Sequence, residues 1–200
     1  MGQVFDEEGK VFPVTLIKAG PVTVTQIKNA EKDGYGAVQF GFDEIPLDRA
    51  DKPQKGKLVK VLGPTAKGFR TFKEWRIKNG KKVPDVKVGD KIDVSSLAEG
   101  ELVNVVAISK GKGFASVIKR HGFKGQPRSH GQKHSEHAPG SIGGGLRNKV
   151  PKGMRMAGRM GSDTVTIKNL KIVKIDKDSN TLLLKGSIPG RKGTLVEIYN

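Results

Sequence analysis

Short runs of β-branched residues, separated by polar or glycine-containing turns, make up most of the chain. In residues 22–28 apolar and polar positions alternate imperfectly with a period of two, as expected for a half-buried strand. Gly20-Pro21 separates this run from residues 11–18, and we predict that the two runs form a hairpin. Further strands are predicted at 37–42, 58–62, 101–109, 164–175, 181–185, 194–199 and, after a turn, within 88–94.

Many short strands with regular turns indicate a mainly β fold whose strands close into a barrel. Composition agrees, because Val and Ile together number 33 against 22 for Leu and Ala. Only two short helices are predicted, one opened by a capping box of Thr71 and Glu74 and one at 115–120. Residues 176–180 are predicted to be a hairpin turn, since a calcium loop would need Gly in place of Thr181 and Glu in place of Ser187.

The length and apolar content allow a packed core. Leu, Ile, Val and Phe supply 53 of the 200 residues, which excludes a chain that is disordered throughout. No run approaches the roughly 18 apolar residues of a membrane span, and the first residues include Asp6 and Glu8, so we expect a soluble, unexported protein. The absence of cysteine excludes disulfides and Cys-ligated zinc, and it is consistent with a reducing compartment.

Positive charge is concentrated in residues 109–160. The chain has a formal net charge of +17, and this segment carries +11 of it, with 12 Lys or Arg and a single acid, Glu136. It also holds 11 of the 27 glycines, while only seven of its 52 residues are Leu, Ile, Val or Phe. Such a segment buries too little apolar surface to offset its ordering entropy. We call residues 109–160 the arm and expect it to become ordered against a polyanionic partner.

The histidines of the arm raise the alternative of a metal-dependent enzyme that acts on RNA. His130 and His134 have the i, i+4 spacing of a helical metal site, but Pro127, Gly131 and Pro139 disfavour a helix there and no HExxH is present. No GxGxxG or GxxxxGK[ST] loop occurs, and carboxylates are too few for two-metal phosphodiester chemistry. An anionic membrane as partner would need an amphipathic helix, which the arm lacks. We expect no catalysis, metal, cofactor or small-molecule substrate.

Nucleic-acid binding explains the composition of the arm better. Lysines and arginines would neutralise phosphates and release counterions, aromatic and imidazole rings would stack on bases, and glycines would let the backbone come close. The residues predicted to contact nucleic acid are Lys110, Lys112, Phe114, Lys119, Arg120, His121, Phe123, Lys124, Arg128, His130, Lys133, His134, His137, Arg147, Lys149, Lys152, Arg155 and Arg159.

Several longer motifs occur in a fixed order along the chain. The motifs within or overlapping the arm are Ser109-Lys-Gly-Lys-Gly-Phe-Ala-Ser-Val-Ile-Lys-Arg-His-Gly-Phe123, Ser129-His-Gly, Pro139-Gly-Ser-Ile-Gly143 and Lys152-Gly-Met-Arg-Met-Ala-Gly-Arg-Met-Gly161. Outside it are Phe12-Pro-Val-Thr and the run Leu-Leu-Leu-Lys-Gly-Ser-Ile-Pro-Gly that ends at Gly190. In order and spacing the motifs resemble the family of the third large-subunit ribosomal protein, the universal L-three family, in its bacterial form. The resemblance covers nearly the whole chain.

The resemblance implies a β-barrel body of the translation-protein type, with an inserted small lobe at about residues 45–95, seated on large-subunit (23S-type) rRNA. It implies that the arm reaches toward the peptidyl transferase centre with residues 141–145 at its apex, which adds Ser141, Gly143 and Gly144 to the predicted RNA-binding residues. It further implies a cytoplasmic, ribosome-bound protein that supports early subunit assembly and shapes, without performing, peptide transfer. The implied neighbours are the fourteenth and nineteenth large-subunit proteins.

Three segments follow from this interpretation. Residues 1–108 are predicted to form the first part of the body with the small lobe, 109–160 the arm, and 161–200 the strands that complete the barrel.

Two features depart from the family pattern. Gly144 stands where many bacterial relatives carry a glutamine, methylated in some, so that modification cannot occur there. The chain begins inside the family's usual first strand, which is therefore expected to be shortened.

Overall fold

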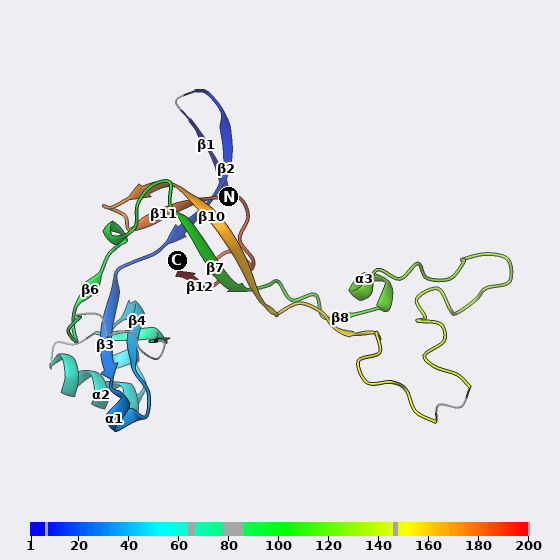
Figure 1. Cartoon of the computed structure of the whole chain (residues 1–200), viewed down its shortest axis with the longest axis horizontal. Helices are drawn as coiled ribbons and strands as arrows, with labels where there is room; N and C mark the ends of the chain where they lie inside the picture. The colour runs from blue at the N-terminus through cyan, green and yellow to red at the C-terminus, as the bar shows by residue number, and fades with distance from the viewer. Residues whose placement is uncertain (7, 64–66, 78–85, 146–147, 200) are drawn as a thin grey trace. The chain divides into compact units, whose positions relative to one another are not determined.

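The computed structural model describes residues 1–6, 8–63, 67–77, 86–145 and 148–199 (Figure 1). These residues form a mainly β structure, which confirms the predicted fold class. The chain divides into two compact units, the first made of Met1–Leu102 with Leu170–Ser187 and the second of Val103–Asn169 with Ile188–Asn200. No helix within the described ranges is long and apolar enough to cross a membrane.

One sheet of the first unit combines strands from distant parts of the sequence. Its order is β1 (Gly2–Phe5), β2 (Val11–Lys18), β11 (Thr181–Lys185) and the C-terminal part of β10 (Thr164–Asp176), with every neighbouring pair antiparallel. Leu182 and Leu184 lie two residues apart and therefore on the same face, where both are fully buried, as is Ile172 of β10. Burial of these aliphatic side chains supplies the apolar core of the sheet.

The second sheet of this unit is formed by residues close in sequence. Its order is β5 (Gly68–Arg76), β4 (Ala37–Ile45), β3 (Val22–Lys28) and β6 (Lys91–Ile92). The helical elements of the unit are α1 (Ala30–Asp33), α2 (Lys52–Leu62) and the 3-10 turns η1 (Leu47–Arg49) and η2 (Val94–Ser96). On β4, a Cβ added to Gly41 would lie 2.6 Å from the ring of Phe69. Glycine at this position therefore makes room for a phenylalanine that is almost completely buried.

The second unit contains the arm and the strands that flank it. The N-terminal part of β10, β7 (Leu102–Ile108) and β12 (Val196–Tyr199) are neighbours in that order. Val103, Val105 and Ala107 alternate along β7 and are buried. Within the arm, β8 (Phe114–Ala115) pairs with β9 (Gly158–Arg159), and α3 (Val117–His121) follows β8.

Most of the predicted elements are confirmed, and three local predictions are wrong. The strands predicted from 11–18, 22–28, 37–42, 101–109, 164–175, 181–185 and 194–199, the short strand within 88–94 and the helix at 115–120 all occur within a few residues of their predicted bounds. The turn at 176–180 joins β10 to β11, and the Asp176 carboxylate accepts a 2.6 Å hydrogen bond from the Ser179 hydroxyl.

The predicted hairpin of residues 11–18 with 22–28 is wrong. β2 pairs with β1 and β11, whereas β3 pairs with β4 and β6, so the two runs belong to different sheets. The turn signal at Gly20-Pro21 marks a change of sheet, because a turn motif specifies a local bend and not the partner of the strand that follows.

Two predictions of secondary structure are also wrong. Residues 58–62 form the last part of α2, where Leu58 alone is buried; a short apolar run does not by itself distinguish a strand from a helix. Thr71 and Glu74, read as a capping box, lie in β5, which pairs with β4 from Gly68 to Arg76. Tertiary strand pairing there prevails over the local helix signal.

Two larger features of the prediction stay predictions. Among the described residues, the two edge strands of each sheet in the first unit do not pair with each other. Closure into a barrel therefore remains a prediction. The same holds for the division into 1–108, 109–160 and 161–200 and for the small lobe at 45–95.

Candidate nucleic-acid interface

The arm begins and ends in an antiparallel stem. The Ser109 amide donates to the Asp163 carbonyl at 2.9 Å, the Lys112 amide to the Met160 carbonyl at 2.9 Å, and the Met160 amide to the Gly113 carbonyl at 2.9 Å. We call residues 109–115 with 158–163 the stem. Gly161 has a φ of +76° and lies so close to the Lys110 carbonyl that an added Cβ would collide with it. Glycine is therefore required at this point, where the two segments of the stem lie against each other.

A single short helix, α3, continues from the stem. Val117 of this helix is fully buried and Ala115 just before it is nearly so. Gly122 ends the helix in the left-handed conformation, with its amide donating to the Ile118 carbonyl at 2.9 Å. Two side chains at the end of α3 contact the segment that leads back to the stem. Arg120 Nη1 lies 2.9 Å and His121 Nε2 lies 3.2 Å from the Met156 carbonyl oxygen.

The first loop of the arm, residues 125–136, is closed by internal contacts. The Gln126 amide donates to the Glu136 carbonyl at 3.2 Å, and Arg128 Nε donates to Glu136 Oε1 at 2.5 Å. His137 Nε2 lies 4.0 Å from the same carboxylate oxygen. An open, polar cavity of about 170 Å³ lies in this loop, lined by Pro127, Arg128, Gln132, Lys133, Ser135 and Glu136. The single acid of the arm thus acts within the arm, as a partner of Arg128.

The second loop, residues 139–155, contains the predicted apex. The Ser141 hydroxyl donates to the Gly143 carbonyl at 3.0 Å, and the Met154 amide donates to the Pro151 carbonyl at 3.3 Å. Ser141, Gly143 and Gly144 are all exposed. Arg147 lies outside the described residues.

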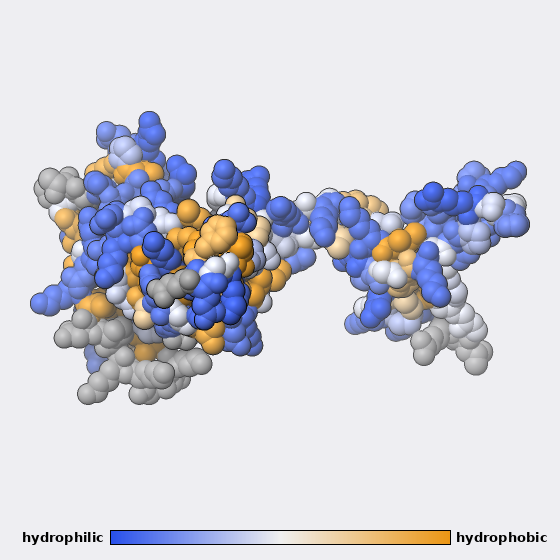
Figure 2. Space-filling view, turned by 90° about the horizontal axis from the view of Figure 1, so that it is seen from above, coloured by the Kyte–Doolittle hydropathy of each residue, from blue (hydrophilic) through white to orange (hydrophobic). Residues whose placement is uncertain are grey.

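The predicted contact residues lie on the surface of the arm. Every one of those described is exposed except His121 and Phe123, which are half-buried with their ring centroids 6.2 Å apart. Most of the visible surface of the arm is hydrophilic (Figure 2). Arg120 and Arg128 have internal partners, whereas the other described cations make no side-chain hydrogen bond or ion pair with any described residue: Lys110, Lys112, Lys119, Lys124, Lys133, Lys149, Lys152, Arg155 and Arg159.

The remaining histidines do not form a cluster with carboxylates. His130, His134 and His137 are exposed, and His130 has a positive φ of 59°. Within the part of the chain that the structure describes, no three His, Asp or Glu side chains are placed so that they could hold a metal ion. The structure therefore gives the histidines no common geometry from which a metal-dependent reaction could be derived.

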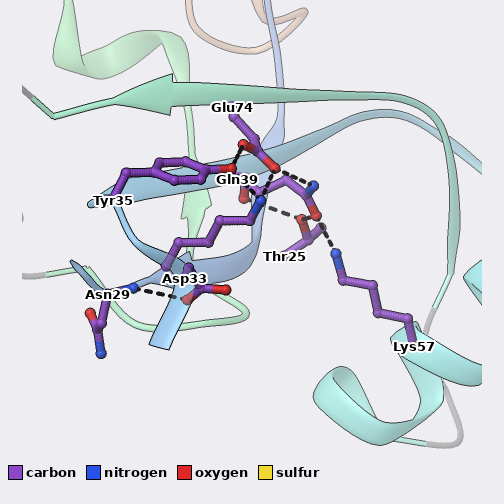
Figure 3. A network of polar contacts seen from close by, with 8 residues as sticks. Thr25, Asn29, Asp33, Tyr35, Gln39, Lys57 and Glu74 are labelled. Atoms are coloured by element: carbon purple, nitrogen blue, oxygen red, sulfur yellow. Dashed lines mark hydrogen bonds and ion pairs between the residues drawn. The ribbon is translucent and has the colours of Figure 1, made fainter. Parts of the chain in front are cut away.

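A second cluster of charge lies in the four-stranded sheet of the first unit (Figure 3). The Glu74 carboxylate lies 2.7 Å from Lys28 Nζ and accepts a hydrogen bond from the Tyr35 hydroxyl at 2.9 Å and from Gln39 Nε2 at 3.3 Å. Lys57 of α2 donates to Gln39 Oε1 at 2.5 Å. These residues come from α2, β3, β4, β5 and the α1–β4 turn.

The contacts in this cluster shift the pKa of its charged groups. Hydrogen bonds from Lys28 and then Tyr35 lower the pKa of Glu74. The pKa of Lys28 is raised because Lys28 donates to the Glu74 carboxylate and, at 2.6 Å, to the Tyr35 hydroxyl oxygen. Burial lowers the pKa of Lys57, and the positive charge of Lys28 adds to that effect. Lys28 and Glu74 thus match each other's charge, and Lys57 donates to a neutral amide; because all these contacts lie within the fold, the cluster is a structural one.

Sequence reasoning missed two features of these regions. Nothing in the sequence indicated that Glu74 is the shared partner of a polar network. The atom of Met156 that matters is its backbone oxygen, which no side-chain pattern can indicate. The Arg-His pair before Gly122 marks a helix C-terminus, but the carbonyl partners that this pattern predicts are those of the helix itself.

Comparisons with known proteins agree with the motifs. The model of the family described as Ribosomal protein L3 matches residues 84–181. A large ribosomal subunit protein uL3 from Herpetosiphon aurantiacus is 47% identical over 199 residues, which are 99% of this chain and 91% of the relative. Those from Nocardia farcinica and Chlorobium limicola are 48% and 43% identical, cover 98% and 100% of this chain, and are themselves covered to 86% and 94%. With such identity along nearly its whole length, the chain belongs to the uL3 family, as its motifs predicted.

Proposed function

We propose that this chain is a structural constituent of the large ribosomal subunit and binds large-subunit rRNA, with the arm as its main contact. The observation that carries the proposal is the set of nine exposed cations of the arm that have no partner among the described residues. An exposed cation without an internal partner contributes little to the fold, but it can neutralise a phosphate and release a counterion. The names of the similar proteins place those proteins in the large ribosomal subunit.

The form of the arm suits an interior position in folded RNA. A paired stem and α3 hold its base, while the described residues of 124–155 form no helix or strand and expose nearly all their side chains. Irregular backbone rich in glycine can follow a crowded RNA groove closely, and planar side chains such as Phe114 and His130 can stack on bases. The role is to bind and shape RNA, so no catalytic residue is assigned.

The finer parts of the proposal follow from the family. The apex at residues 141–145 would approach the peptidyl transferase centre and shape its surroundings without taking part in the reaction. The protein would bind early in subunit assembly, in the cytoplasm, beside the fourteenth and nineteenth large-subunit proteins.

Salt-resolved binding tests the RNA-binding role. The full chain is titrated against 23S-type rRNA between 50 and 200 mM salt, and cofractionation with large subunits is measured over the same range. If 6 to 10 phosphates are neutralised, affinity should fall by roughly 10³ to 10⁵ across this interval. A protein that fractionates apart from large subunits, or an affinity insensitive to salt, would overturn the proposal.

A photocrosslinking residue in place of Ile142 tests the position of the apex. Crosslinks to RNA around the peptidyl transferase centre are expected, because Ile142 lies between the predicted apex contacts and is more than a third exposed. The same group at Leu16 of β2, an exposed residue of the first unit, serves as the control and should give a different set of crosslinks. Crosslinks from position 142 only to remote RNA would contradict the proposed apex but leave RNA binding itself intact.

A further inference from the structure

We propose that Arg120 and His121 are positioning residues that hold the arm in its binding shape, so that their part in RNA binding is indirect. Both side chains reach one backbone oxygen, that of Met156, on the chain returning to the stem. We call these three residues the clasp. The inference rests on the proposed RNA-binding function, which it deepens by separating residues that present the arm from residues that contact RNA.

The contacts of the clasp join segments that are far apart in sequence. Arg120 Nη1 donates to the Met156 oxygen at 2.9 Å, and His121 Nε2 lies 3.2 Å from the same atom. A carbonyl oxygen has two lone pairs and can accept both bonds, which requires the histidine to carry its proton on Nε2. Because the partners are 35 and 36 residues apart, the two bonds close the whole excursion from 122 to 155 into one ring.

Gly158 makes space for the clasp. A Cβ added to Gly158 would lie 2.7 Å from Arg120 Nη1 and 3.4 Å from Cζ, so any larger residue would push the guanidinium away. The backbone of Gly158 is not in the left-handed region, so conformational freedom does not explain the glycine. The close approach of the Arg120 guanidinium explains why glycine is present.

The same helix also positions the first loop. Ile118 of α3 packs against Gly125, where an added Cβ would lie 2.7 Å from Ile118 Cδ1 and 2.7 Å from the Glu136 carbonyl oxygen. Val117, the first residue of the helix, is fully buried. An isolated helix of five residues is not stable in water, so α3 depends on its packing and on the clasp. Both loops of the arm are therefore oriented from one small anchor.

The neighbour of Arg120 provides a contrast. Lys119 is exposed and has no side-chain partner among the residues described, so it belongs with the cations available to phosphates. A phosphate contact contributes about 0.7 to 0.9 to the slope of log affinity against log salt. A residue that acts by holding a backbone oxygen changes affinity through the shape of the arm, and a variant that retains its charge should leave that slope unchanged.

Charge-retaining variants of the full chain test the inference. Arg120→Lys keeps the charge but cannot reproduce the guanidinium geometry, and Gly158→Ala displaces the guanidinium without changing any charge. We expect each to lower affinity for 23S-type rRNA roughly tenfold, the cost of about one hydrogen bond to a charged group, with an unchanged salt slope. Lys119→Ala should instead lower the slope by about 0.7 to 0.9.

Hydrogen exchange in the free protein provides a readout that does not depend on RNA. Arg120→Lys and Gly158→Ala should both speed amide exchange at residues 156–160, whereas Lys119→Ala should not. Gly144→Ala is the matched glycine control for this measurement, since nothing lies within 4 Å of its added Cβ. Parental exchange and parental affinity in both clasp variants would overturn the inference, as would a slope lowered by Arg120→Lys. If the parent protein itself fails to bind rRNA, the proposed function fails, while the exchange result still decides whether the clasp exists.

Discussion

The two clusters of charge in this protein differ in where their partners are. Around Glu74, Lys28 and Lys57 contact groups of their own sheet and helix, and a carboxylate lies at the centre. In the arm, nine described cations make no such contact, and Glu136 is already engaged by Arg128. Matched charge belongs to the stability of the fold, whereas unmatched charge remains available to a partner. Lysine content alone therefore does not distinguish a structural region from a binding region.

The difference depends on the acids more than on the bases. The charge of the Glu74 carboxylate is used inside the fold, since Lys28 and Tyr35 both donate to it and thereby lower its pKa. With Glu136 as its single acid, the arm has no means of matching its 12 cations.

Loss of four arm cations should have the largest effect. Lys149→Ala, Lys152→Ala, Arg155→Ala and Arg159→Ala together should lower the slope of log affinity against log salt by roughly 3, since each phosphate contact contributes about 0.7 to 0.9. Thermal unfolding of the free protein should change little, because these side chains have no described partners. Filter binding to rRNA at several salt concentrations measures the slope.

An equal change of charge in the first unit is the control for this variant. Lys18, Lys32, Lys52 and Lys60 are exposed and have no side-chain partner among the described residues, so their replacement by alanine removes the same charge. The slope should fall by less than in the arm variant. Equal slopes for the two variants would show that net charge, and not the arm, determines binding.

Core truncation should affect the two regions differently. Leu182→Ala removes a fully buried side chain of β11 and should lower the free energy of unfolding by about 2 to 5 kcal/mol. Val117→Ala also removes fully buried atoms, but in the arm, which holds only seven Leu, Ile, Val or Phe residues. Urea denaturation should report a large loss only for Leu182→Ala, and hydrogen exchange at residues 156–160 should report the loss of Val117. A similar global loss for both would mean that the arm base folds together with the rest of the chain.

The sequence predicts the strands well because their β-branched runs are local signals. It fails where the outcome depends on distant partners. Gly20-Pro21 is a turn in either topology, and only pairing with β11 and β6 decides that the flanking strands enter different sheets. Likewise, Thr71 and Glu74 satisfy a helix signal locally but pair along β4.

The candidate site follows the same rule. Exposure of the arm cations was predictable because one acid cannot match them. The exceptions, Arg120 and Arg128, depend on a backbone oxygen and on a carboxylate reached through folding. Those contacts are tertiary, so composition could not separate these two arginines from the others.

Glu74→Gln should have a smaller effect, confined to the first unit. The lowered pKa of Glu74 means that its contribution to stability is present above its ordinary value of 4.5 and is lost as pH falls through the lowered pKa. The raised pKa of Lys28 preserves the contribution up to alkaline pH. The stability difference between parent and variant should therefore be constant from about pH 5 to 9 and shrink below pH 4.5.

Chemical denaturation over this pH range measures the difference. Glu31→Gln, an exposed change in α1 of the same unit, controls for the loss of one negative charge. Binding of rRNA should be unaffected by Glu74→Gln at neutral pH. A fall in RNA affinity, or a stability difference that does not shrink as the solution is acidified below pH 4.5, would show that the cluster is not the self-contained structural network described above.

Gly56→Ala should have the smallest effect and the opposite sign. Gly56 lies inside α2, and nothing lies within 4 Å of an added Cβ, so the substitution gains helix propensity without a clash. It should raise the free energy of unfolding by about 0.5 to 1 kcal/mol. Gly144→Ala in the arm also meets no neighbour but lies in no helix, so its unfolding free energy should stay near the parental value. A gain from Gly56→Ala with an unchanged salt slope would show that the stability of the first unit and the charge available to RNA vary independently, whereas a loss would mean that α2 is under a constraint that propensity does not describe.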